Sequence, residues 1–197
     1  NPDPVVRPVT KHPSRTYGPG SPYRRFRPSR GGNRDFLLKD SYRLMLARDI
    51  AAIVNTEGPL HKDVLLERLK ELHEVERAGS NIEGNFRSAL QHALQGKMVD
   101  RRSEEDFIWP VDRNLFSFSS FRTPGDGVVR TLELIPREEI ELAVLFLVED
   151  QFGMIREYVP QAVARPFGIE RLAASGADRI RDIVDGLVEK GLLRVSG

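Results

Sequence analysis

The chain has 197 residues, of which 40% are hydrophobic and 30% are charged, a composition typical of folded globular proteins. The absence of cysteine excludes a disulfide framework, a thiol nucleophile and a cysteine-ligated zinc site, and it suits the reducing cytoplasm. No run of 18 apolar residues is present, so neither a transmembrane helix nor a membrane partner is expected. The opening "NPDPVVRPVT" has no initiator methionine and no apolar signal-peptide region, and we expect a fragment of a longer protein.

The formal net charge of +1 conceals an uneven distribution along the chain. Residues 1–36 carry eight basic and two acidic side chains, whereas residues 37–110 and 111–197 have net charges of −2 and −3. Residues 1–36 are also rich in proline, glycine and serine and lack apolar periodicity. They are therefore predicted to form an irregular basic linker, or an arm that lies on another domain. Alternatively, Arg24, Arg25 and Arg27 could contact a nucleic acid.

The apolar spacing between residues 37 and 112 predicts three helices followed by a β-hairpin. Gly58-Pro59 ends the first helix, and Gly79 and Gly96 flank the third. The predicted buried positions of the three helices are, in chain order, Leu46, Ile50, Ile53 and Val54; Val64, Leu65, Leu69 and Leu72; and Ile82, Phe86, Leu90, Ala93 and Leu94. Three short helices and a hairpin form the order of a winged helix-turn-helix domain.

The same order recurs towards the C-terminus, with helices expected at residues 137–151, 155–164 and 177–190. Gly58 and Gly153 are 95 residues apart, as are Gly96 and Gly191, which indicates an internal repeat. We therefore predict a mainly α fold with small β wings. It consists of tandem winged helix-turn-helix domains at residues 37–112 and 136–197, joined by a linker at 113–135, after the irregular tail. Only one wing strand, "LLRV", follows the last helix, so the second wing is predicted to be truncated or completed from elsewhere.

Two stretches carry a resemblance to a known family. They are "IVNTEGPLHKDVLLERL", continued by "ERAGSNI", and "LELIPREEIELAVLFLVEDQFGMIREYVPQAVARPFGI". Over roughly residues 40–195 the chain resembles the domain of unknown function at the extreme C-terminus of large bacterial superfamily 1 helicase-like proteins, where it follows a Vsr-like endonuclease domain. The resemblance implies a parent protein that is an ATP-dependent helicase with a nuclease domain. It implies that the other domains of that protein are partners and that this fragment has no catalytic role.

The four histidines do not form a catalytic or metal-binding pattern. His12, His61, His73 and His92 show neither His-x-x-His nor His-Glu-x-x-His spacing, and no phosphate-binding loop or nucleophile elbow occurs. His61 is instead expected near the N-terminus of the second helix, where its ring can bond an exposed backbone group. We predict no catalytic residue, no metal site and no cofactor in this chain.

The third helix of the first domain is the predicted nucleic-acid-binding element, with DNA as the expected partner. It carries asparagine, glutamine and arginine side chains away from its buried stripe, and these types bond base edges or phosphates. The predicted contact residues are Arg77, Asn81, Asn85, Arg87, Gln91, Arg101 and Arg102, with tail contacts from Arg24, Arg25 and Arg27. The negative net charges of both predicted domains argue against strong non-specific binding.

A protein-interaction or architectural role is the alternative hypothesis. In that case the two domains pack on the catalytic domains of the parent protein or form a homodimer. The near-neutral surface, the apolar "FSFSSF" and an open strand edge in the incomplete second wing favour this role.

Overall fold

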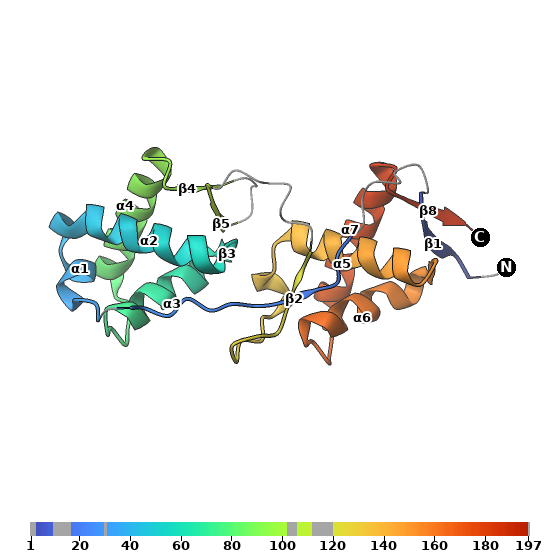
Figure 1. Ribbon diagram of the computed structural model, residues 1–197, viewed down its shortest axis with the longest axis horizontal. Coiled ribbons are helices and arrows are strands. Elements are labelled where there is room, and N and C mark those ends of the chain that lie inside the picture. The colour runs from blue at the N-terminus through green and yellow to red at the C-terminus, as the bar shows by residue number, and fades with distance from the viewer. Residues whose placement is uncertain (1–2, 10–16, 30, 102–105, 112–119, 197) are drawn as a thin grey trace. The chain divides into compact units, whose positions relative to one another are not determined.

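The computed structural model describes residues 3–9, 17–29, 31–101, 106–111 and 120–196, and it divides into two compact units. The first unit comprises residues 24–113. The second unit combines residues 1–23 with residues 114–197. Both are mainly helical with small sheets (Figure 1). Among the described residues, no helix has the length and apolar character needed to cross a membrane.

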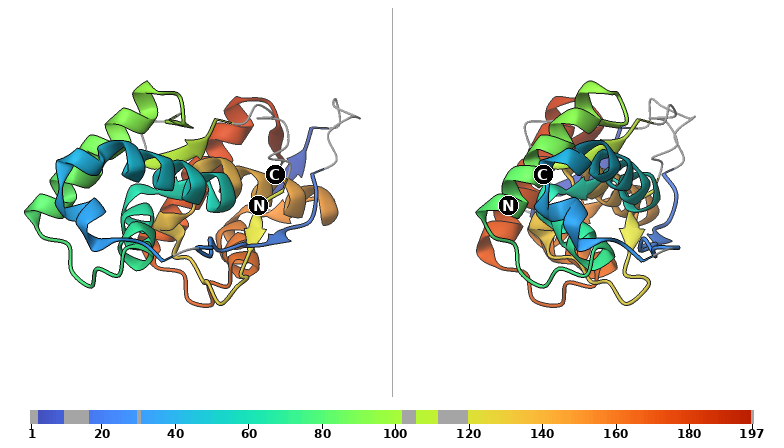
Figure 2. Two further views of the ribbon diagram at one scale, coloured as in Figure 1. Left: turned by 60° about the vertical axis from the view of Figure 1, so that its left-hand side comes forward. Right: turned by 90° about the vertical axis from the view of Figure 1, so that its left-hand side faces the viewer.

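The first unit packs three main helices beside a short three-stranded sheet. Its elements are α1 (Arg34–Leu38), a 3-10 turn (Asp40–Tyr42), α2 (Arg43–Glu57), β3 (Leu60–His61), α3 (Lys62–Leu72), α4 (Ser80–Gln95), β4 (Val99–Asp100) and β5 (Phe107–Pro110). The sheet order is β3-β5-β4, so β5, the last strand of this unit along the chain, is the central strand. Helices α2 and α4 make the most extensive contact, and Figure 2 shows them crossing.

The apolar positions predicted for the first unit form its core. Leu46, Ile50, Ile53 and Val54 of α2 are fully buried, and so are Leu65 and Leu69 of α3. The stripe on α4 from Ile82 to Ala93 is buried as well. Val64 and Leu94, which were also predicted to be buried, are only half-buried because they lie at the margins of their stripes. The helical periodicity thus identified the packing faces correctly.

The second unit repeats this order of elements with a different chain path. Its elements are β1 (Val5–Pro8), β2 (Ser21–Pro22), β6 (Arg122–Thr123), α5 (Arg137–Asp150), β7 (Met154–Ile155), α6 (Val159–Ala164), α7 (Ala174–Glu189) and β8 (Leu193–Ser196), with 3-10 turns at Leu132–Leu134, Arg156–Tyr158 and Arg165–Phe167. The sheets are β7-β1-β8 and a parallel pair, β2-β6. Residues 120–135, predicted to be part of a linker, belong to this unit, and Phe121 is buried in its core.

The N-terminal strand β1 occupies the centre of the sheet in the second unit. Val6 lies opposite Met154 of β7 on one side and opposite Val195 of β8 on the other. Val6 is also fully buried in the core of this unit. The prediction that residues 1–36 are irregular is therefore wrong for β1 and for the start of α1. The second sheet is not truncated, and Figure 1 shows β1 beside β8 near the two chain ends.

Strand pairing relates the two units residue by residue. The pair Leu60–Ile108 in the first unit corresponds to Met154–Val6 in the second. In the same way, Val99–Pro110 corresponds to Leu193–Pro8. Leu60 and Met154 are 94 residues apart, as are Val99 and Leu193. β1 is therefore the counterpart of β5, although it comes from the opposite end of the chain.

The turns after α4 and α7 correct the predicted offset of 95 residues. The left-handed position that follows each helix is Lys97 (φ 52°) in the first unit and Gly191 (φ 68°) in the second. Gly96 instead occupies the preceding C-cap with a φ of −75°. The predicted equivalence of Gly96 with Gly191 is thus one residue out of register, because glycine marks different positions in the two turns.

Candidate nucleic-acid interface

One flank of α4 is engaged by α1 within the first unit. The side-chain amide of Asn85 donates to the carbonyl of Leu37 (2.9 Å), and that of Asn81 donates to the carbonyl of Leu38 (3.1 Å). These are terminal carbonyls of a short helix, which lack intrahelical partners. Asn81 and Asn85 were predicted to face bases, but here their amide groups hold α1 against α4.

The surface of α4 opposite its buried stripe forms an exposed polar ridge. Arg87, Gln91 and Gln95 follow one another at a spacing of four residues, and Lys97 lies in the turn after the helix. All four side chains are exposed, and within the described part of the chain none of them makes a side-chain hydrogen bond or ion pair. We define these four residues as the α4 ridge. Two of its residues, Arg87 and Gln91, are among the predicted nucleic-acid contacts, whereas Gln95 and Lys97 are not.

The sequence carried a signal for Gln95 but none for Lys97. Gln95 extends the four-residue spacing of Arg87 and Gln91 by one more turn. Lys97 follows the C-cap residue Gly96 in a left-handed turn, where helical spacing no longer applies.

The remaining predicted contacts have different environments. Arg77, before α4, and Arg101, after β4, are exposed, whereas Arg102 lies outside the described residues. In the tail, Arg24 and Arg27 are exposed, but the guanidinium of Arg25 pairs with Glu71 of α3 at 2.6 Å. Arg25 thus attaches the tail to the first unit.

Helix α7 of the second unit, the counterpart of α4, has an acidic exposed face. Asp178, Asp182 and Glu189 are exposed, and Asp185 is half-buried. Two arginines on this helix serve the fold, since Arg181 pairs with Asp178 at 2.6 Å and Arg179 donates to backbone carbonyls. Arg156 likewise pairs with Asp185, so it is the charges of Asp182 and Glu189 that disfavour a phosphate backbone near this face.

Buried charges in both units are matched by partners. In the first unit the carboxylate of Glu57 accepts from the side chain of Arg68 (2.8 Å) and from the backbone N–H of Phe26 (2.7 Å). In the second unit Glu139 is fully buried and accepts from Arg122 and Arg130 at 2.6–3.0 Å. These contacts explain the burial of two carboxylates without any catalytic role.

The pKa of Glu139 is lowered by its two arginine partners. Burial by itself would raise this pKa, because it disfavours the charged form. The positive charges and hydrogen bonds of Arg122 and Arg130 outweigh burial and hold the pKa below the ordinary value of 4.5. Both guanidinium groups also lie about 5 Å from the centre of the buried Tyr23 ring, at 5.0 and 4.9 Å, so the same cluster fixes the end of the N-terminal segment.

Two histidines have structural roles in the first unit. The Nδ1 of His61 accepts from the backbone N–H of Asp63 (3.3 Å) at the start of α3, as predicted. The Nδ1 of His73 accepts from the backbone N–H of Asn33 (3.1 Å), and its Nε2 lies 3.2 Å from the carboxylate of Asp49. His73 and Asp49 are only 1% and 8% exposed in their side chains, so this pair is closed to a substrate.

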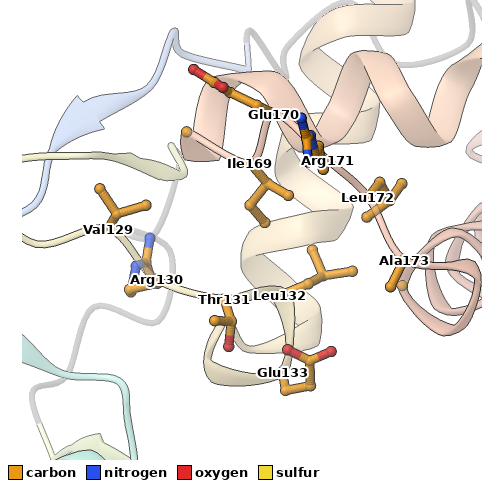
Figure 3. A pocket seen from close by; sticks show the side chains of 12 residues that line it. Val129, Arg130, Thr131, Leu132, Glu133, Ile169, Glu170, Arg171, Leu172 and Ala173 are labelled. Atoms are coloured by element: carbon orange, nitrogen blue, oxygen red, sulfur yellow. The ribbon is translucent and has the colours of Figure 1, made fainter.

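A pocket of about 360 Å³ opens on the second unit between residues 129–133 and 168–176. Figure 3 shows Val129, Leu132, Ile169 and Leu172 around it, with Glu170 and Glu133 at opposite ends of the view. Its lining includes no serine, histidine or cysteine. In the described ranges, no group of three or more potential ligands among His, Cys, Asp and Glu could hold a metal ion. The pocket can accommodate an apolar group, and its polar lining consists of the hydroxyl of Thr131 and the charged side chains of Arg130, Glu133, Glu170 and Arg171.

Comparison with known proteins identifies part of the first unit. Residues 35–84 match the model of a family described as a protein of unknown function (DUF3320). The match runs from Asp35 in α1 to Gly84 in α4. No curated protein and no solved structure matches the chain. The match covers 50 of the 197 residues, so it shows a similarity to that family over this segment.

Proposed function

We propose that the first unit is a winged-helix module that binds nucleic acid, with DNA as its partner. The order α2, β3, α3, α4, β4, β5 and the central position of β5 support this assignment. In the proposed arrangement α3 and α4 form the helix-turn-helix, α4 enters a groove, and the β4–β5 wing approaches the backbone. By the same criteria the second unit is a second winged helix, with β1 in place of the last wing strand.

The α4 ridge is the observation that carries the proposal. Eight residues separate Arg87 from Gln95, which is about 12 Å along an α-helix. The major groove of B-DNA, about 12 Å wide, admits an α-helix, so side chains along one face of α4 can reach the base edges. Arginine and lysine contact phosphates or guanine, and glutamine bonds adenine edges, so this row combines positioning with base recognition.

The composition of the first unit is compatible with moderate, salt-sensitive binding. It contains 17 basic and 15 acidic side chains, so it lacks the large positive field of a strong non-specific binder. Exposed Arg77 and Arg101 add positive charge before and after α4. We therefore expect the α4 ridge, and not overall charge, to determine affinity.

The acidic face of α7 favours a different role for that helix, that of a protein-interaction or architectural surface. We propose that α7 does not enter a nucleic-acid groove. We also propose, from the resemblance to C-terminal domains of helicase-like proteins, that the whole chain serves a larger helicase and nuclease protein and contains no catalytic group of its own.

The test is a salt titration of the full chain against labelled duplex, single-stranded and forked DNA. Each phosphate contact on duplex DNA contributes a slope of about −0.9 to the plot of log K against log salt concentration. The double change Arg87→Ala and Lys97→Ala should therefore flatten the slope by about one to two. Gln91→Ala should alter the preference among sequences and leave the slope unchanged.

Arg48→Ala is the matched control, because it removes one exposed arginine from α2, outside the α4 ridge. An unchanged slope in the Arg87→Ala and Lys97→Ala variant, or an equal loss in the Arg48→Ala variant, contradicts the proposal. Deletion of residues 1–36 is unsuitable as a test, because it removes β1 from the second unit and part of α1 from the first.

A further inference from the structure

Two arginines lie directly opposite each other in the sheet of the second unit. Arg7 of β1 pairs in register with Arg194 of β8, and both side chains are exposed. Directly opposite residues of an antiparallel pair project from the same face, with Cβ atoms about 4.5–5.5 Å apart. Neither arginine has an ion-pair partner in the described part of the chain. This face therefore presents two positive charges side by side.

The fold does not require this pair of charges. Like charges directly opposite each other destabilise a sheet. At the corresponding positions of the first unit, the strands carry Trp109 and Asp100. The arginine pair costs stability, and the first unit forms the same sheet without it. This combination indicates that the arginines serve a function on that face.

Arg7 is held in a defined orientation. Its Nε donates to the hydroxyl of Ser196 (3.2 Å), and its Nη1 donates to the backbone carbonyl of Phe152 (3.3 Å). A guanidinium has five N–H donors, so donors remain for an anion. A group that is already oriented loses less conformational entropy when a ligand binds.

Phe152, whose carbonyl accepts from Arg7, is the most exposed large apolar residue of the described chain, at 83%. It also has a left-handed backbone with a φ of 55°, which disfavours bulky residues. Burial therefore does not account for phenylalanine at this turn, and backbone preference opposes it. The turn whose backbone carbonyl accepts from Arg7 therefore carries an exposed aromatic ring that is open to stacking.

We propose that Arg7, Arg194 and Phe152 form a binding site for single-stranded nucleic acid. The two guanidinium groups contact backbone phosphates, and the ring of Phe152 stacks on an unpaired base. Glu149 and Asp150, which precede Phe152 in the last turn of α5, repel phosphates on that side. The phosphates are therefore placed over β1 and β8, and the base over Phe152.

This site is distinct from the α4 ridge and goes beyond the function proposed for the first unit. It exists only because β1 inserts beside β8, which brings Arg7 opposite a residue 187 positions later in the chain. The two proposals fail separately. Substitutions at the α4 ridge should affect duplex binding, whereas substitutions at this site should affect single-stranded binding.

The test compares binding of the full chain to labelled oligothymidylate and to an abasic strand of equal length, over a range of salt concentrations. Wild type should bind oligothymidylate more tightly, by about fivefold or more for one stacked base. Arg194→Gln should flatten the salt slope for both strands by about 0.7, the value for one phosphate contact on a single strand. Phe152→Gly should abolish the preference for oligothymidylate, whereas Phe152→Trp should keep it.

Thermal unfolding separates a binding role from a folding role. Arg194→Gln relieves the repulsion with Arg7, and Phe152→Gly relieves the backbone strain, so both variants should melt at the same or a higher temperature than wild type. Each measurement is repeated in the Arg87→Ala and Lys97→Ala variant to remove the contribution of the α4 ridge. Equal wild-type binding of the two strands, or an unchanged slope in the Arg194→Gln variant, overturns the proposal. Binding of an acidic peptide with the same dependence on all three residues also overturns it.

Discussion

The two units build the same three-stranded sheet from different parts of the chain. In the first unit the central strand β5 follows β4 directly along the chain, whereas in the second unit the central strand β1 comes from the N-terminus. The residues pair in the same register in both sheets, so Val6 occupies the position of Ile108. A sheet position is thus defined by the hydrogen bonds and the core that it offers, and chain order is secondary.

The same comparison separates folding residues from residues that are free to act. The position inside the sheet is apolar and fully buried in both units, as Val6 and Ile108 show. The next position along the central strand differs, since Trp109 is 4% exposed whereas Arg7 is exposed. Likewise α4 presents a neutral to basic ridge and α7 an acidic face. The shared architecture constrains the interior, and the surfaces have diverged.

The largest effect is expected from a charge at the inner position of the central strand. Val6→Asp should destabilise the second unit by roughly 3–5 kcal/mol, because it buries an unpaired carboxylate. The single tryptophan, Trp109, lies in the first unit, so its fluorescence reports only that unit, whereas circular dichroism reports both. The dichroism transition should shift to lower temperature while the fluorescence transition stays.

Ile108→Asp is the matched change in the first unit. In this variant the unfolding transition followed by tryptophan fluorescence should move to lower temperature. If the dichroism and fluorescence transitions move together in either variant, the two units do not unfold separately. Their stabilities then cannot be compared as those of independent units.

The next largest effect concerns the buried charge cluster of the second unit. Glu139→Gln should cost roughly 3 kcal/mol, because it leaves Arg122 and Arg130 without a counter-charge. The folded-state pKa of Glu139 lies below 4.5, so the ionised group contributes stability above pH 4.5, and this contribution is lost as pH falls through the folded pKa.

Urea unfolding of wild type and the Glu139→Gln variant between pH 3 and pH 7 measures this contribution. The difference in unfolding free energy between the two proteins should be constant at neutral pH and shrink in acid. A difference that grows in acid would mean that the pKa of Glu139 is raised and not lowered.

A smaller effect is expected where α1 meets α4. Asn85→Ala should cost about 1 kcal/mol, because the terminal carbonyl of Leu37 loses its hydrogen bond. The salt slope for DNA binding should not change, since the amide of Asn85 serves the fold. Amide hydrogen exchange should report faster opening of residues 34–38. If amide exchange of residues 34–38 is unchanged and the variant loses its preference among DNA sequences, Asn85 contacts a base and does not serve the fold.

The smallest effect concerns the turns that end α4 and α7. Lys97→Gly should stabilise the first unit by about 0.5–1 kcal/mol, because glycine adopts the left-handed conformation without strain. Gly191→Lys should destabilise the second unit by a similar amount, because lysine is strained in the left-handed conformation. No steric clash adds to this strain, since nothing lies within 4 Å of an added Cβ. Thermal melts of the two single variants should shift in opposite directions.

The sequence by itself determined the main helices, their buried faces and the repeated order of elements, because the 3.6-residue period and the helix-ending glycines are local properties. It did not separate α1 from α2, and it placed a helix over residues 155–158, where the structure has the end of β7 and a 3-10 turn. It also identified the capping role of His61 and two members of the α4 ridge. Its register was one residue out, since Lys97 occupies a turn position that glycine usually marks.

Only the tertiary structure decided the place of the N-terminal strand and the use of the polar side chains. A four-residue strand with an arginine and a proline has little stability of its own, so β1 forms only where β7 and β8 supply hydrogen bonds on both sides. Asn81 and Asn85 bond the terminal carbonyls of α1 because buried or partly buried polar groups require partners, whichever element supplies them. Arg7 and Arg194 meet for the same non-local reason, since the pairing of strands from opposite chain ends has no trace in the local sequence.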